Sequence, residues 1–329
     1  MRSRGLDFEK PLIELSQHIA QLKAFAQANP ELDITKGIKA LEEDTKHLTQ
    51  QTFQKLTRWD IVRLARHEAR PQASIYINAI LDNPIELYGD KLYGDDRALI
   101  GGFAWFDGQP IVYLAQQKGT DLKERLAVNF GYTRPEGYRK ARRLMKLAEK
   151  FNRPIVCFVD TPGAHVDQES EERGQAIAIA ENIAEMSHLR VPIVVVLIGE
   201  GGSGGALAIA VGDRVLMMEY AIYCVAPPEA CSSIVWKDDG KRAPEATEGY
   251  KPTAVDLLEF GIIDEIIREP LGGAHRDVEL ATRQAKSAIR KHLKALMPIA
   301  PELLIQQRYE RYRKIGIYGE ENYQLTIDN

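Results

Sequence analysis

The stretch IGEGGSGGALAIA, residues 198–210, holds five glycines within positions 199–205. Glycine inside regular structure is unfavourable by roughly 0.5–1 kcal/mol relative to alanine, so this density needs a structural reason. The apolar run 191–199 predicts a buried strand before the glycines, and residues 205–213 predict an apolar helix after them. The stretch therefore predicts a strand, a glycine-rich turn and a helix.

A second glycine-containing turn lies one unit upstream. Residues 153–160 predict a short strand, DTPGA (160–164) a turn, and residues 169–189 a helix with an acidic first turn. Crossovers between parallel strands are right-handed, so both turns are expected at the carboxyl edge of one sheet, where ligands of α/β folds usually bind. Facing N–H groups from two such turns predict an oxyanion hole, and glycine there permits a positive φ and close approach of a ligand.

Three other interpretations of the glycine-rich turn stay open on pattern alone. GGSGG fits G-x-S-x-G, the nucleophile elbow, with Ser203 as nucleophile and His275 or His292 as base. GEGGSG is a shifted variant of the G-x-G-x-x-G phosphate turn, although no G-K-[ST] follows. The remaining interpretation is a tight turn whose glycines only allow a helix to pack closely on the sheet.

The rest of the chain predicts three parts. Apolar residues spaced by three and four on either side of Asn29-Pro30 predict an αα-hairpin, and Asp107-Gly108 between apolar runs predicts a β-hairpin. We therefore expect a helical hairpin over 1–57, a main α/β domain over 58–300, and a C-terminal helix and tail over 301–329.

Composition excludes several classes of protein. The 329 residues are 44% hydrophobic and 27% charged, enough for a sizeable core, and the net charge of −4 is not that of a nucleic-acid-binding domain. No apolar run approaches the ~20 residues of a membrane span, and no signal-peptide pattern begins the chain. Three cysteines without C-x-x-C spacing predict neither a zinc ribbon nor disulfides. We expect a cytoplasmic protein that binds neither membranes nor nucleic acid.

Several stretches together resemble one family, over about residues 5–300. They resemble the alpha subunits of bacterial acetyl-coenzyme A carboxylase carboxyltransferases, in the crotonase superfamily. The resemblance implies an α/β, crotonase-like (ClpP/crotonase) spiral of ββα units with an N-terminal helical hairpin. The matching stretches are LDFEKP (6–11), LARH (64–67), QKG (117–119), PEGYRKA (135–141), DTPGA (160–164), EERGQ (171–175), EGGSGGALAI (200–209) and EPLGGAHRD (269–277).

The resemblance also implies a reaction and partners. A carboxyl group moves to acetyl-CoA from carboxybiotin, supplied in trans by the biotin carboxyl carrier protein, to give malonyl-CoA, the first committed step of fatty acid biosynthesis. Activity requires a beta subunit in an α2β2 assembly, and biotin carboxylase is a further partner. The four-cysteine zinc module of the family belongs to beta, so no metal is expected in this chain.

Site residues carry over from the family by position. Gly204 and Gly205 would donate N–H groups to the biotin ureido oxygen as it gains negative charge. The carboxybiotin pocket would be shaped by five further residues of the two turns: Gly163, Ala164, Gly201, Gly202 and Ser203.

Two departures from the family pattern keep other hypotheses open. His165-Val166-Asp167 follow Ala164 where the family usually has Tyr-Pro-Gly, and Pro227-Pro228-Glu229-Ala230 stand where it tends to have Ser-Pro-Glu-Gly. The alternatives are a crotonase-type acyl-CoA enzyme acting alone and a non-catalytic subunit that has kept the fold. Arg173 and Lys118 are candidate contacts for CoA phosphates, with a purely structural charge as the alternative.

Overall fold

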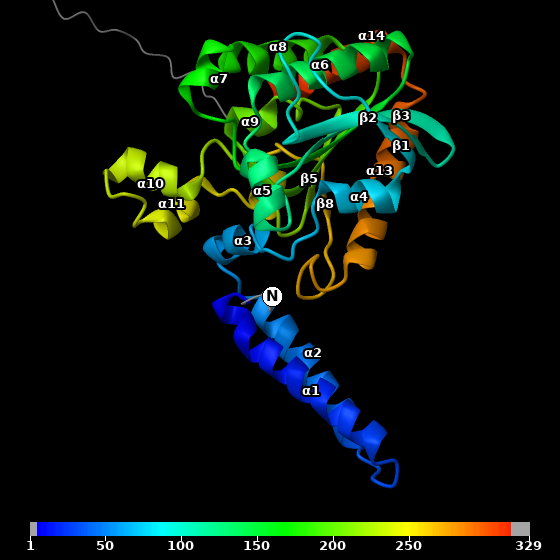
Figure 1. The fold of residues 1–329 in the computed structure, drawn as a ribbon, viewed down its shortest axis with the longest axis vertical. Coiled ribbons are helices and arrows are strands. Elements are labelled where there is room, and N and C mark those ends of the chain that lie inside the picture. Colours follow the sequence, from blue (N-terminus) through cyan, green and yellow to red (C-terminus); the bar gives the residue numbers. More distant parts are fainter. Residues whose placement is uncertain (1–4, 317–329) are drawn as a thin grey trace, which may run out of the picture.

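A mixed sheet of eight strands forms the centre of the protein (Figure 1). The computed structural model describes residues 5–316. The strand order is β1-β2-β3-β4-β5-β6-β8, with β7 also paired to β5. The pairs β1–β2 and β2–β3 are antiparallel, and all other pairs, beginning with β3–β4, are parallel. The strands are β1 (Asp82–Glu86), β2 (Leu99–Phe106), β3 (Gln109–Gln116), β4 (Ile155–Thr161), β5 (Ile193–Gly202), β6 (Arg214–Met218), β7 (Ile222–Cys224) and β8 (Glu265–Ile267).

The turn between β2 and β3 confirms the predicted β-hairpin. Phe106 pairs with Gln109 across the two-residue loop, and both loop residues, Asp107 (φ 49) and Gly108 (φ 79), have positive φ. Two positive φ angles are typical of the type I′ turn, whose twist matches that of the flanking strands.

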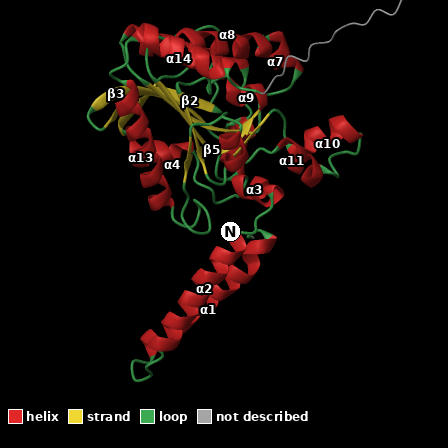
Figure 2. Ribbon diagram, turned by 180° about the vertical axis from the view of Figure 1, so that it is seen from behind, coloured by secondary structure: helices red, strands yellow, loops and turns green. Residues whose placement is uncertain are grey.

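Helices cover both faces of the sheet (Figure 2). The helices α6 (Pro135–Lys150), α8 (Gln175–His188) and α14 (Pro301–Arg313) lie on one face, and α4 (Ala73–Ile80) and α13 (Val278–Leu296) on the other. Shorter elements connect these layers: η1 (Asp7–Glu9), α3 (Arg58–Ala65), α5 (Leu122–Ala127), η2 (Asn129–Gly131), α7 (Gln168–Glu172), α9 (Ser203–Leu207), α10 (Pro228–Trp236), α11 (Ala243–Tyr250) and α12 (Ala254–Glu259).

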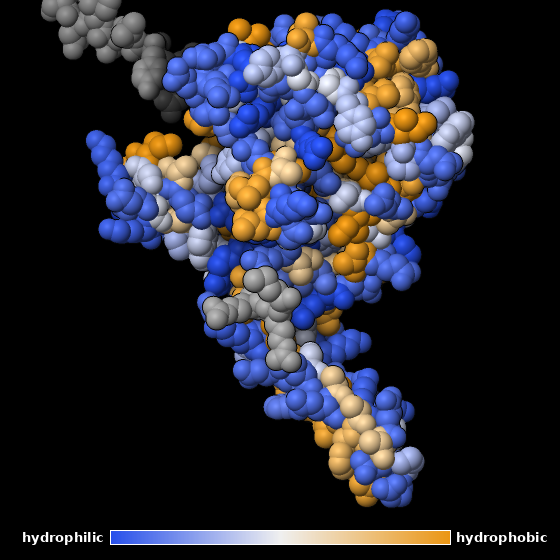
Figure 3. All heavy atoms as spheres, in the orientation of Figure 1, coloured by the Kyte–Doolittle hydropathy of each residue, from blue (hydrophilic) through white to orange (hydrophobic). Residues whose placement is uncertain are grey.

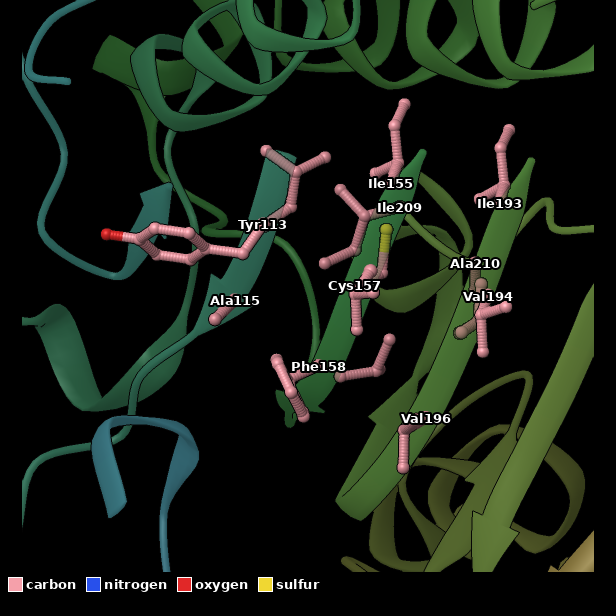
Figure 4. Packing of buried hydrophobic residues seen from close by; sticks show 14 of the residues in the cluster. Tyr113, Ala115, Ile155, Cys157, Phe158, Ile193, Val194, Val196, Ile209 and Ala210 are labelled. Atoms are coloured by element: carbon pink, nitrogen blue, oxygen red, sulfur yellow. The ribbon is translucent and has the colours of Figure 1, made fainter. Parts of the chain in front are cut away.

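The core is centred on β4 and β5, whose residues are all buried. Central parallel strands are covered on both faces, which explains their continuous apolar runs. Figure 4 shows side chains such as Cys157 of β4 and Val194 of β5 packed beside Ile209 and Ala210, which follow α9. The strand expected to end at residue 199 is longer in the structure, because β5 continues through Gly202 and pairs there with β7. Residues 199–202 of the glycine-rich stretch are therefore part of a fully buried strand.

Two predicted helices differ in length from the observed ones. The helix expected over 205–213 is wrong in extent, because α9 ends at Leu207 and the apolar residues 208–211 form a buried turn instead. The helix expected over 169–189 is broken into α7 and α8 by Gly174, whose φ of 79° is left-handed. Burial accounts for the first difference, since apolar residues fill the core here without being helical.

The N-terminal hairpin consists of α1 (Lys10–Ala28) and α2 (Thr35–Phe53), which pack on each other and extend away from the sheet (Figures 1 and 2). At its base the Phe53 ring lies 5.9 Å from that of Phe8 and 5.6 Å from that of Tyr220. Apolar side chains are exposed farther along the hairpin (Figure 3), namely Leu22, Phe25, Leu32 and Leu48.

The division of the chain after residues 57 and 300 stays a prediction. Within the described residues α14 is not separate from the main body, because it packs on α8 and buries Leu304 and Arg308. The part of the expected tail beyond residue 316 lies outside the described residues. No helix in the described range 5–316 has the length and apolar character needed to cross a membrane.

Candidate functional site

The two glycine-containing turns meet at the carboxyl ends of β4 and β5, as predicted. These strands are parallel neighbours, and Thr161 pairs with Gly201. A Cβ placed on Gly202 would overlap the carbonyl oxygen of Pro162, and one placed on Gly205 would lie 2.5 Å from the carbonyl carbon of Gly163. The backbones of the two turns are therefore in direct contact.

The expectation that these glycines provide positive φ is wrong. None of the five between 199 and 205 has a positive φ, whereas Ser203 does (φ 55). Close packing of neighbouring atoms explains why most of these positions are glycine. A Cβ on Gly199 would lie 2.8 Å from Asp160 Cγ, and one on Gly201 would lie 2.5 Å from Leu197 Cδ2. Gly204 differs, because its nearest atom would be Ile179 Cγ2 at 3.6 Å, an ordinary contact.

A largely apolar cavity of about 520 Å³ opens beside the glycine-rich turn. Ser203 and Gly204 line it, whereas Gly163, Ala164, Gly201, Gly202 and Gly205 are not among its lining residues. All seven predicted site residues thus lie together, but they divide into two that face the cavity and five that join the turns. Further lining comes from β7, α11, α12 and α14, through Tyr223, Cys224, Tyr250, Leu257, Phe260 and Tyr312.

The turn offers free backbone donors. Ser203, Gly204 and Gly205 form the first turn of α9, where N–H groups have no carbonyl four residues earlier in the helix to accept them. The aligned peptide dipoles add partial positive charge at such an end. The arrangement is therefore suited to stabilising an oxygen that gains negative charge in the cavity.

The two basic residues considered for CoA phosphates are bound within the chain. Lys118 Nζ lies 2.8 Å from Asp160 Oδ1 and 2.6 Å from Glu200 Oε2. Arg173 forms ion pairs with Glu136 and Glu169, and its guanidinium lies over the Tyr93 ring. Both basic side chains therefore form ion pairs within the chain, as the structural alternative to CoA binding predicts.

Residues 165–167, which differ from the family pattern, form a turn that caps the start of α7. Asp167 is the N-cap of α7 and accepts a hydrogen bond from Ser170 N at 2.6 Å. His165 is held by this turn, with Nδ1 3.2 Å from Ser170 Oγ and its backbone N–H donating to Thr133 O. At the second departure Glu229 accepts a hydrogen bond from Arg66 at 2.7 Å.

The serine-nucleophile interpretation has no geometric support among the described residues. His275 Nε2 lies 3.0 Å from Glu9 Oε1, and His292 Nε2 lies 2.7 Å from Glu265 Oε2. Neither imidazole is hydrogen-bonded to Ser203, and both are paired with carboxylates elsewhere in the fold.

A buried cluster of Glu9, His67 and His275 has the spacing of metal ligands. Local sequence spacing does not predict it, because Glu9 and His275 are 266 residues apart. The Ala69 N–H donates to His67 Nδ1 at 3.1 Å, so the proton of the neutral ring is on Nε2, the atom facing Glu9. This proton would have to leave before Nε2 could ligate a metal. In the described residues the Glu9 carboxylate contacts His275 Nε2 at 3.0 Å and Arg276 Nη2 at 2.9 Å, so the cluster joins the N-terminal segment to the main body.

The cluster predicts a pH-dependent stability. Burial, together with the neighbouring His275, lowers the pKa of His67 to about 4; Glu9 and Glu68 oppose this and Arg276 adds to it. Between pH 6.5 and 4 the unfolded chain binds a proton at His67 that the folded chain does not, so stability falls as pH falls. From pH 7 to 5 this contributes a loss of about 1–2 kcal/mol in the free energy of unfolding.

Urea unfolding at both pH values tests this expectation. His67→Gln keeps an amide in reach of Glu9 and is expected to reduce the wild-type pH dependence by about 1–2 kcal/mol. His47→Gln on α2 replaces an exposed imidazole and serves as the control, with an unchanged pH dependence. Equal pH dependence in the wild type and His67→Gln contradicts the assignment.

Solved structures with a similar fold define the class. The transcarboxylase 12S core solved with methylmalonyl-coenzyme A matches with a TM-score of 0.55 and 21% identity, over 69% of this chain and 42% of that chain. A Pseudomonas malonate decarboxylase hetero-tetramer solved with coenzyme A matches with a TM-score of 0.54 and 16% identity, over 67% and 89% of the two chains. The fold is that of the crotonase-like carboxyltransferases, which confirms the predicted fold class.

Sequence relatives define the family within that class. A family model described as acetyl co-enzyme A carboxylase carboxyltransferase-like matches residues 5–316. The acetyl-coenzyme A carboxylase carboxyl transferase subunit alpha of Geobacter metallireducens is 50% identical over 96% of this chain and 98% of its own length. The Thermus thermophilus subunit of the same name is 48% identical over 96% and 99%. The chain belongs to the acetyl-coenzyme A carboxylase carboxyltransferase alpha-subunit family.

Proposed function

We propose that this chain is the alpha subunit of a cytoplasmic acetyl-CoA carboxyltransferase. The complex it forms transfers a carboxyl group from carboxybiotin on the biotin carboxyl carrier protein to acetyl-CoA, giving malonyl-CoA for fatty acid synthesis. The proposed assembly is α2β2 with a zinc-bearing beta subunit, and biotin carboxylase regenerates the carboxylated carrier. Family membership and the 50% identity to a named alpha subunit support this function.

One observation supports the proposed position of the site: at Gly204 a free backbone N–H donor lies next to the large cavity. Its N–H lies in the first turn of α9, and the residue lines the cavity of about 520 Å³. We propose that the N–H groups of Gly204 and Gly205 bind the ureido oxygen of biotin, with Ser203 shaping the pocket. Gly163, Ala164, Gly201 and Gly202 act by fixing the two turns against each other. A bound carboxybiotin supplies the activated carboxyl group, and this chain supplies orientation and charge stabilisation.

Gly204→Val tests the placement. A Cβ at Gly204 has room beside Ile179, so the chain is expected to fold, while the valine methyl groups enter the cavity beside the donors. Valine keeps the backbone N–H, but its methyl groups block access to it, so we expect the effect of losing one oxyanion donor, a roughly 10²–10³-fold lower kcat. The measurement is malonyl-CoA formation by the chain copurified with its beta subunit, given acetyl-CoA and carboxylated carrier protein.

The same assay separates the alternatives. No malonyl-CoA from the wild-type complex, with firm binding of beta, favours the non-catalytic subunit. Turnover of an acyl-CoA by the isolated chain favours an enzyme acting alone. If the wild-type complex is active and Gly204→Val is equally active, the proposed position of the site is wrong, although the proposed function still holds.

A further inference from the structure

A charged network links the two turns of the site, and none of its side chains lines the large cavity. Lys118, just after β3, bridges Asp160 at the end of β4 and Glu200 in β5, at 2.8 and 2.6 Å. The Glu200 N–H also donates to Asp160 Oδ1 at 2.9 Å. Because β3, β4 and β5 are neighbours, one ammonium group holds the carboxyl ends of two parallel strands together.

Arg66, which follows directly after α3, extends the network to α10. Its Nε lies 2.5 Å from Glu200 Oε1, and its Nη1 lies 2.7 Å from Glu229 Oε1 at the start of α10. Burial alone raises the pKa of Glu200, but the charges of Lys118 and Arg66 outweigh it and hold the pKa below its usual range. Glu200 is therefore an anion at neutral pH, balanced by two cations.

The network is close to the donors along the chain. Asp160 is followed by the 161–164 turn, and Glu200 stands four residues before Gly204. The Asp160 carboxylate also lies against Gly199, where a Cβ would be 2.8 Å from its Cγ. A shift of either carboxylate therefore changes the contact between Gly205 and the Gly163–Ala164 peptide.

We propose that Lys118 is a positioning residue that sets the spacing of the two turns and hence the direction of the Gly204 and Gly205 N–H groups. The proposal rests on the proposed function for its effect on turnover, but not for its effect on the coupling of the turns. Lys118 does not line the large cavity; it lines a second cavity of about 280 Å³ with its partners Asp160 and Glu200. In the proposed role it acts on the donors through these two carboxylates.

The test compares Lys118→Met with Lys140→Met in the reconstituted complex. Lys140 is a matched control, since its side chain is fully buried and pairs with Asp95 at 2.6 Å outside the network. Lys118→Met is expected to lower kcat about 100-fold, the scale of a misplaced oxyanion donor, with KM for acetyl-CoA within about threefold of the wild type. Lys140→Met is expected to lower stability without this change in kcat, and Lys118→Arg to restore most of it.

Amide hydrogen exchange gives a readout that does not need turnover. Peptides covering 161–166 and 199–207 are expected to exchange about tenfold faster in Lys118→Met and at the wild-type rate in Lys140→Met, because less stable segments open more often. Asp160→Asn, which keeps the side-chain shape, is expected to shift both readouts in the same direction and serves if Lys118→Met does not fold.

The outcomes separate the two proposals. An inactive wild-type complex contradicts the function, while faster exchange in the variant still supports the coupling of the turns. Exchange at the wild-type rate in both segments of Lys118→Met, or kcat within threefold of the wild type in an active complex, overturns the positioning role.

Discussion

Gly205→Ala is expected to lower the proposed carboxyl transfer at least about 100-fold and to destabilise the chain by about 1–3 kcal/mol. The added Cβ meets backbone rather than a flexible side chain, lying 2.5 Å from Gly163 C and 3.0 Å from Gly163 Cα. Backbone cannot give way by changing rotamer, so the two turns must separate. Separation moves the Gly205 N–H away from the position in which it would act.

Steady-state kcat and urea unfolding measure the two effects. Gly204→Ala is the matched control for the unfolding measurement only, because Gly204 is itself a proposed donor. Its Cβ would lie 3.6 Å from Ile179 Cγ2, and its φ is not positive, so the unfolding free energy is expected within about 1 kcal/mol of the wild type. Unchanged stability and turnover in Gly205→Ala would show that contact between the turns is not needed.

Arg308→Met is expected to destabilise the chain by about 3–5 kcal/mol. The guanidinium of Arg308, whose side chain is 1% exposed, makes a bidentate pair with Asp213 at 2.8 and 2.9 Å. It also donates to the carbonyl oxygens of Met186, Leu189 and Val191. Its loss leaves a buried carboxylate and three carbonyl groups without their donor, and the penalty for such groups exceeds the net value of the bonds.

Arg190→Met provides the comparison for urea unfolding. Arg190 pairs with Glu302 at the surface, where the two side chains are 52% and 71% exposed, so its loss is expected to change stability by less than about 1 kcal/mol. Similar effects for the two variants would contradict the anchoring of α14 through Arg308.

Regular structure was predictable where local pattern and tertiary burial agree. The Asp107-Gly108 turn needs two positive φ angles, and those residue types accept them. The strands around Val156 and Val194 are continuously apolar up to Val159 and Ile198 because both faces of the sheet are covered. The extent of α9 was not predictable, since Ile209 and Ala210 are buried without being helical.

The site was predictable in place but not in detail. Two glycine turns at the ends of neighbouring parallel strands had to meet, yet between 199 and 205 the residue with positive φ is Ser203 rather than one of the five glycines. The ion pairs of Lys118 and Arg308 join residues distant in sequence, and no local spacing encodes them. The signal available was an acidic residue directly after an apolar run, such as Asp160 or Asp213, and this signal does not identify the basic partner.

The N-terminal hairpin has a mechanical consequence. Each of its helices has 19 residues, so the hairpin is a lever about 28 Å long. It is held at its base by the rings of Phe8, Phe53 and Tyr220 and by the Glu9 cluster. A tilt of about 10° at that base carries the far end through about 5 Å, the width of a polypeptide chain. Small rearrangements around Glu9 are thus magnified at Phe25 and Leu32, where apolar side chains face solvent.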